Sequence, residues 1–159
     1  MSSPRGLANH SLYLARIQLA AWSAEPAREI IPAATLAQAF APAACDHLKR
    51  AYGWFLLTLS GHSDTSIAPP RCCSELPEIA TGKALPAEIK EFAQLEQAGW
   101  LAELLSFQIT APSQHRPVPG HRGNLAVQTS GYPSAVEVTG YANQLDAHMA
   151  RMSNSLDEY

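Results

Sequence analysis

The chain has 159 residues and a net charge of −3, and 16% of its residues are charged while 47% are hydrophobic. This length and hydrophobic content predict a single folded domain over residues 1–159 and argue against a disordered chain. The 11 Lys and Arg residues form no run, which argues against sequence-independent binding to nucleic acid. The low charged fraction is typical either of a surface partly covered by a partner or of an alanine-rich surface of small neutral residues.

The first expected element is a helix over residues 7–24. Its buried face is predicted by apolar residues at helical spacing, namely Leu12, Ala15, Leu19 and Trp22. His10 and Arg16 interrupt the apolar core that an export signal would need. A cytoplasmic protein with reduced cysteines is therefore expected.

The second expected helix covers residues 32–60. Pro42 falls inside it, and the missing backbone N–H predicts a kink or a break there. Over residues 52–59 both faces are apolar, because Trp54 and Leu57 lie opposite the main stripe. A helix that is apolar all round is buried on every side, so this stretch is either the central helix or an interface with a second copy.

The same stretch bears on two further expectations. It has eight residues, against the roughly twenty that a membrane-spanning helix needs, so no membrane partner is expected. Gly53 inside it lowers helix stability by about 1 kcal/mol relative to alanine. We expect the glycine to allow the close approach of a neighbouring helix.

The middle of the chain predicts short elements. Residues 61–73 form a loop, and one helical turn is expected within residues 74–80. A further helix is expected to begin at Pro86, to be interrupted by Gly99, and to continue as a short apolar helix from Trp100.

A long Pro/Gly/Ser-rich loop, residues 109–133, precedes the last helix, and residues 124–128 are a candidate extended piece inside it. The last helix begins at Ser134 with Glu137 three residues on, which is a capping box. The sequence thus predicts an all-α fold, an irregular antiparallel bundle of four main helices with a long Pro/Gly-rich loop before the last one.

Three stretches carry a family resemblance: "NHSLYLARIQLAAW" at 9–22, "DHLKRAYGWFLLTLSG" at 46–61 and "LEQAGWLAELL" at 95–105. Together with the final "LDEY", they resemble an uncharacterised bacterial family of small all-helical domains of unknown function. The matching positions are apolar and aromatic packing residues, so the resemblance implies a fold and no activity. The family's second helix is unbroken, and Pro42 is a departure from its pattern.

The most site-like stretch is "QHRPVPGHRG", residues 114–123. Arg116 and His121 have the arginine-histidine spacing of helical HEPN-type ribonucleases, but the prolines and glycine between them exclude a helix. Arg5 and His10 repeat the spacing at the start of the first helix and are the better candidates for such a site.

The same basic loop has two simpler interpretations. It is either a solvated or anion-binding loop, or a partner for the acidic tail Asp157 and Glu158, whose charges the helix macrodipole disfavours.

Spacing argues against a metal or nucleophilic site. Asp146 and His148 are two residues apart, which places them on different faces of a helix. Adjacent Cys72 and Cys73 lack the spaced pairs of structural zinc, and Cys45 belongs to an apolar face. No catalytic residue, cofactor or metal is therefore assigned.

These observations favour a non-enzymatic protein that acts through protein–protein contacts, as a homodimer or with another protein. Trp54, Leu57 and Trp100 are the expected interface residues, because aromatic side chains carry much of the energy of interfaces. The alternatives are a HEPN-like ribonuclease or nucleotide-acting enzyme that uses Arg5 and His10, and a small-ligand binder with a pocket between helices.

Overall fold

The structure is a computed structural model, and it describes residues 3–26, 29–79, 81–108 and 131–158. Those residues form five α-helices and a 3-10 turn, and no strand occurs among them: α1 (Pro4–Ala24), α2 (Ala33–Leu59), η2 (Cys73–Glu75), α3 (Ala87–Leu95), α4 (Trp100–Ser106) and α5 (Ala135–Asp157). The all-α prediction is confirmed. None of these helices has the length and hydropathy that crossing a membrane would require.

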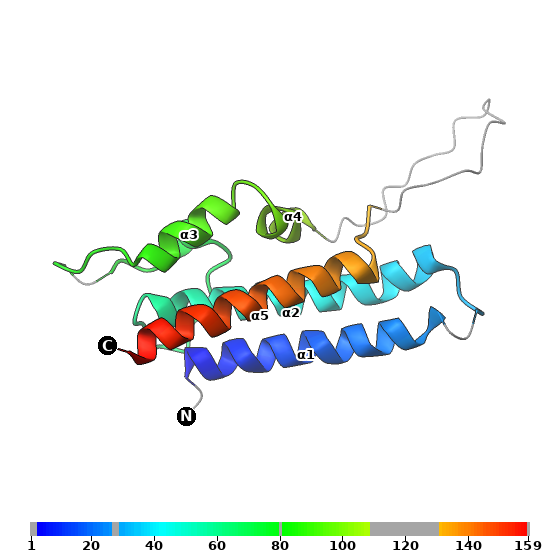
Figure 1. Ribbon diagram of the computed structural model, residues 1–159, viewed down its shortest axis with the longest axis horizontal. Helices are drawn as coiled ribbons and strands as arrows, with labels where there is room; N and C mark the ends of the chain where they lie inside the picture. Colours follow the sequence, from blue (N-terminus) through cyan, green and yellow to red (C-terminus); the bar gives the residue numbers. More distant parts are fainter. Residues whose placement is uncertain (1–2, 27–28, 80, 109–130, 159) are drawn as a thin grey trace.

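The three long helices lie side by side, with α1 running opposite to α2 and α5 (Figure 1). The short helices α3 and α4 lie on the side of α2 and α5 that is away from α1. Among the described elements, α2 contacts all four other α-helices. The interruption predicted at Gly99 separates α3 from α4, and Gly99 has the positive φ of 103° that glycine adopts without strain. The antiparallel packing of four main helices stays a prediction.

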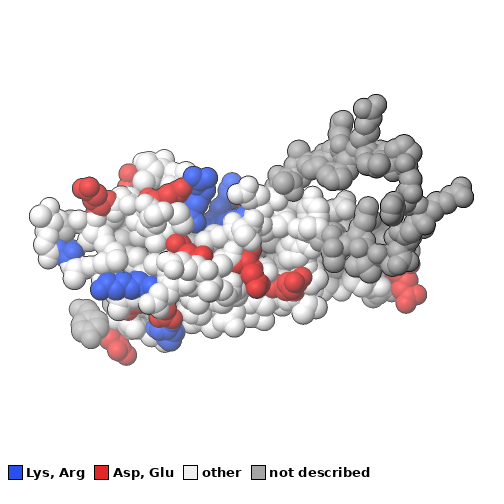
Figure 2. All heavy atoms as spheres, turned by 90° about the horizontal axis from the view of Figure 1, so that it is seen from above, with Lys and Arg blue, Asp and Glu red and all other residues white. Residues whose placement is uncertain are grey.

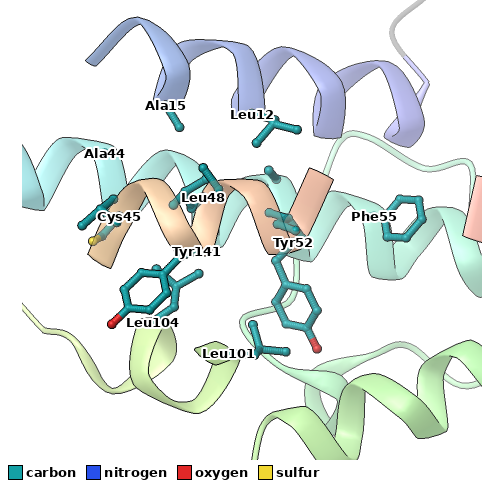
Figure 3. Close-up of a cluster of buried hydrophobic side chains, with 14 of the residues drawn as sticks. Leu12, Ala15, Ala44, Cys45, Leu48, Tyr52, Phe55, Leu101, Leu104 and Tyr141 are labelled. Carbon is teal, nitrogen blue, oxygen red and sulfur yellow. The ribbon is translucent and has the colours of Figure 1, made fainter. Parts of the chain in front are cut away.

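The central position of α2 explains why residues 52–59 are apolar on all sides. Tyr52, Phe55 and Leu57 are fully buried by the chain itself. Figure 3 shows part of this core, where Leu12 and Ala15 of α1 point toward Leu48 of α2. On the other side of α2, Leu101 lies near Tyr52 and Leu104 near Tyr141.

The predicted break at Pro42 is not found, because α2 continues through it as one helix. Proline removes one backbone hydrogen bond, a cost of about 3 kcal/mol in a helix interior. The neighbouring residues Ala41, Ala44 and Cys45 are buried in the core. Burial of this face by the surrounding helices offsets that cost.

Gly53 does allow a close approach, but the neighbour is a loop where a helix was expected. A Cβ at Gly53 would lie 2.3 Å from the carbonyl oxygen of Pro70 and 2.9 Å from the Cβ of Pro69. The loop between α2 and η2 therefore packs its backbone directly on the central helix.

The helix ends follow local capping chemistry. The first helix begins at Pro4, earlier than expected, because the Ser3 side chain accepts a hydrogen bond from the Gly6 N–H. The predicted capping box at Ser134 and Glu137 is confirmed. The helical turn expected within residues 74–80 is the shorter η2.

Candidate functional site

The three predicted interface residues differ in how much surface they offer. Leu57 is fully buried by the chain itself, so it has no surface to present to a partner. Leu57 lies opposite the main apolar stripe of α2, and it is buried there because α2 is central and is covered on that side too. Trp54 and Trp100 are half-buried. The Trp100 ring lies 5.7 Å from the His148 ring, measured between centroids.

Arg5 and His10 do not converge on one site. They are five residues apart on α1, which separates them by about 140° around the helix axis. The Arg5 guanidinium donates hydrogen bonds to both carboxylate oxygens of Asp157, at 3.0 and 3.2 Å. Arg5 is thus already paired with a carboxylate, while His10 is exposed on another side of the helix.

Residues 114–123 lie outside the described residues, as does the candidate extended piece at 124–128. In the acidic tail that the basic loop was expected to neutralise, Asp157 has a partner in Arg5 of α1. This pair joins the first turn of α1 to the last turn of α5 and lowers the pKa of Asp157, chiefly through the hydrogen bond.

Titratable side chains meet in the core where α2, η2 and α3 join. Glu96 Oε1 accepts hydrogen bonds from the Tyr52 hydroxyl and from the Cys73 backbone N–H, both at 2.7 Å. The Cys73 thiol lies 3.4 Å from the same hydroxyl. Burial raises the pKa of Cys73 to about 11, so this thiol is a poor nucleophile, and the cluster fastens η2 to the core.

The part of the chain that the structure describes contains no group of three metal-ligating side chains close enough to share an ion. Its three cysteines are free thiols. Cys45 is buried, and desolvation raises its pKa to about 11.

The outer face of α1 differs from the exposed side of most surface helices in its residue composition. In Figure 1, α1 lies at one edge of the molecule, with α2 and α5 on one side of it only. Its exposed side includes Tyr13 at 62% and Ile17 at 47% of their full exposure. His10, Ala20, Ala21 and Ala24 are also exposed. A surface helix normally presents charged residues on this side, and this one presents none.

Both charged residues of α1 are turned toward α5. Arg5 pairs with Asp157, and Arg16 donates hydrogen bonds to Asn143 at 2.7 Å and to Asp146 at 2.9 Å. The buried apolar face of α1 sets the rotation of the helix, and these exposed contacts lie along its α5 side. They also leave the outer face of α1, which we define as residues 10, 13, 17, 20, 21 and 24, without charge.

This face was not predicted from the sequence, although its residue spacing is visible there. His10, Tyr13, Ile17, Ala20 and Ala24 are spaced alternately by three and four residues, which is the spacing of a helix–helix seam. The buried face of α1 shows the same spacing more strongly. Only the packed structure tells which of the two seams is already occupied.

A cavity of about 1170 Å³ lies between the end of α1, the starts of α2 and α5, and α4. It is lined by aromatic and small apolar side chains and by the carboxylates Glu103 and Glu137. It is the kind of space in which an inter-helix ligand would bind.

Comparison with protein-family models, with curated proteins and with solved structures found no match for this chain. The resemblance to the small helical bacterial family therefore stays an expectation.

Proposed function

We propose that this protein acts through protein–protein contacts and self-associates through the outer face of α1. The observation that carries the proposal is the absence of charge from that face, although Tyr13 and Ile17 are exposed on it. Isolated exposed apolar residues are ordinary, but a contiguous stripe along one helix is characteristic of an interaction surface.

A second copy of the same face is the occupant that the residues favour. In a two-fold antiparallel pairing centred on Ile17, each Tyr13 faces Ala21 of the other copy and each His10 faces Ala24. Large side chains then meet small ones, as close helix packing requires. Because the face contains no Lys, Arg, Asp or Glu, two copies meet without repulsion between such side chains.

The expected dimer is reversible. One helix pair is a smaller contact than the standard interface of about 1,600 Å². Trp54, half-buried on α2, is an additional candidate contact, whereas Leu57 is withdrawn from the interface because it is buried.

The proposal is tested by sedimentation velocity over a concentration series, with a matched pair of variants. Ile17→Glu is expected to convert the dimer to monomer, because two buried carboxylates would meet at the two-fold axis. Ile67→Glu is the control, since Ile67 is an equally exposed isoleucine, at 48% against 47% for Ile17, but lies in the loop after α2. The control is expected to dimerise like the natural protein.

The register has its own test. Because Ile17 faces its own copy, mixing Ile17→Glu with Ile17→Lys should restore a heterodimer from two monomeric variants. A natural protein that is monomeric at all concentrations, or an Ile17→Glu variant that still dimerises, would overturn the proposal. Failure of the mixture alone would refute the antiparallel register.

A further inference from the structure

Lys49 differs in its surroundings from Lys83 and Lys90, the other two lysines of the chain. It lies on α2 and is half-buried, whereas Lys83 and Lys90 are exposed. Its Nζ donates a hydrogen bond to the backbone carbonyl of Phe107 and lies 5.8 Å from the centroid of the Phe107 ring. The Lys49 amine is therefore held against the end of α4 and does not extend into solvent.

Lys49 lines a cavity of about 620 Å³ between α2, the loop before η2 and the end of α4. Much of the wall is apolar, and the residues that make it so are Pro42, Pro69, Pro70, Leu105 and Phe107. A space of this size and lining can hold a small molecule with an apolar or aromatic body. Among the described lining residues, Lys49 supplies the one primary amine.

The other charged side chains of the cavity are paired with one another. Arg50 forms a salt bridge with Asp46 at 3.1 Å, and Arg71 forms one with Glu75 at 2.6 Å. Within the described residues, neither carboxylate therefore forms a salt bridge with Lys49. On the face of the molecule seen in Figure 2, the blue side chains of the left half likewise lie among red ones.

The position of Lys49 favours the neutral form of its amine. Burial lowers the pKa of Lys49, although the nearby Cys45 and Asp46 oppose this effect. The Phe107 ring also favours the charged form, but its carbonyl accepts a hydrogen bond from the amine in either state. In the neutral form the nitrogen lone pair is free, and only this form attacks a carbonyl carbon.

We propose that Lys49 is a reactive amine that forms an imine with a small aldehyde bound in this cavity. The ammonium first releases one proton to water. The nitrogen lone pair then attacks the aldehyde carbon, and a proton moves from nitrogen to the former carbonyl oxygen. The resulting carbinolamine loses its hydroxyl group and the remaining proton on nitrogen as water, which leaves a C=N bond.

Amine and aldehyde thus give imine and water, and the step needs no oxidant or reductant. The apolar or aromatic body of the aldehyde lies against Leu105, Phe107 and the prolines of the wall. This inference goes beyond the self-association proposed above, because it concerns the cavity beside α4 and not the outer face of α1.

The test compares the three lysines in one reaction. The full chain is treated at pH 7 with a limiting amount of benzaldehyde and with sodium cyanoborohydride, which reduces each imine to a stable secondary amine. Peptide mapping by mass spectrometry then gives the modified fraction at each lysine. Lys49 is expected to be modified about threefold or more over Lys83 or Lys90, because the neutral fraction of an amine rises as its pKa falls. In concentrated guanidinium chloride the three lysines are expected to react equally.

Two variants and a second probe complete the test. Lys49→Arg keeps the positive charge, and its total modification is expected to fall to that of the two exposed lysines. Lys90→Arg is the matched control on α3, and it is expected to keep the label at Lys49. Acetaldehyde has no body to lie in the cavity, so its preference for Lys49 is expected to be smaller. Circular dichroism establishes that each variant is folded.

Modification of Lys49 that equals or falls below that of the exposed lysines would overturn the proposal. A preference for Lys49 that persists in guanidinium chloride would overturn it too, because the fold would then not be its cause. An equal preference with acetaldehyde would refute the placement of the aldehyde body in the cavity. Sedimentation is not the readout of any of these experiments, so the two proposals succeed or fail separately.

Discussion

Replacing Gly53 by alanine tests the contact between the central helix and the loop that covers it. In a helix interior this change ordinarily stabilises by about 1 kcal/mol. Here the new Cβ would lie 2.3 Å from the carbonyl oxygen of Pro70, whereas ordinary van der Waals contact begins at 3.4 Å. The methyl group therefore requires the loop to retreat from the helix.

The magnitude follows from what has to move. Overpacking a core costs about 1–3 kcal/mol, and the value lies at the upper end when the obstacle is backbone. The obstacle here is the backbone of a Pro69–Pro70 pair, whose φ angles are fixed by their rings. Subtracting the helix-propensity gain leaves a net loss of about 2 kcal/mol, or about 6 °C in Tm for a chain of this size.

Gly140→Ala is the control that the chain offers. Gly140 is also inside a long helix, but it is exposed, and a Cβ there would meet no atom within 4 Å. This variant is expected to gain about 1 kcal/mol. Both are measured by urea unfolding followed by circular dichroism. A Gly53→Ala variant as stable as the natural protein would refute the close loop contact.

Further predictions concern the ends of α5 and the thiols. Ser134→Ala removes the first half of the capping box and is expected to lower the free energy of unfolding by about 1 kcal/mol, measured by the urea midpoint at constant slope. Arg5 lowers the pKa of Asp157, so this pair contributes stability above the ordinary pKa of 3.8 that is lost as pH falls through the lower folded value. Asp157→Asn should therefore lower Tm at pH 7 and low salt, and the difference from the natural protein should vanish in acid and shrink in high salt; a constant difference would contradict the pairing. Burial raises the pKa of Cys45 and Cys73 to about 11, so both should react with a disulfide reagent at pH 8 far more slowly in the native protein than in urea.

The helices could be predicted well from the sequence, because the residues that begin and end a helix lie close together in the chain. The Ser134 capping box is fully specified by residues three apart, and the interruption at Gly99 by one residue with a permissive backbone. The break considered at Pro42 does not occur, because the cost of the missing hydrogen bond is local whereas the burial that offsets it comes from other helices. The glycine at position 53 correctly predicted a close approach to α2, but a glycine does not indicate whether the neighbour is a helix or a loop.

The candidate surfaces depend on the tertiary structure far more. Leu57 was predicted to be an interface residue but is buried, because the sequence of an all-round apolar helix is the same whether its own chain or another chain covers it. The cavity near the start of α5 gathers Trp22, Glu103 and Tyr141 from three helices distant in the sequence, and no spacing rule predicts that they meet.

From the sequence alone it could be predicted that this chain is helical, where most of its helices begin and end, and that one helix is buried on all sides. Those properties follow from the side-chain periodicity and capping of contiguous residues. Which helix faces are solvent-exposed is known from the tertiary structure. Burial of one apolar face of α1 against the core sets the rotation of that helix, and that rotation leaves Tyr13 and Ile17 on the outside while Arg5 and Arg16 pair with α5. Whether a side chain is exposed depends on which neighbouring helices cover it, so the sequence of one helix does not determine it.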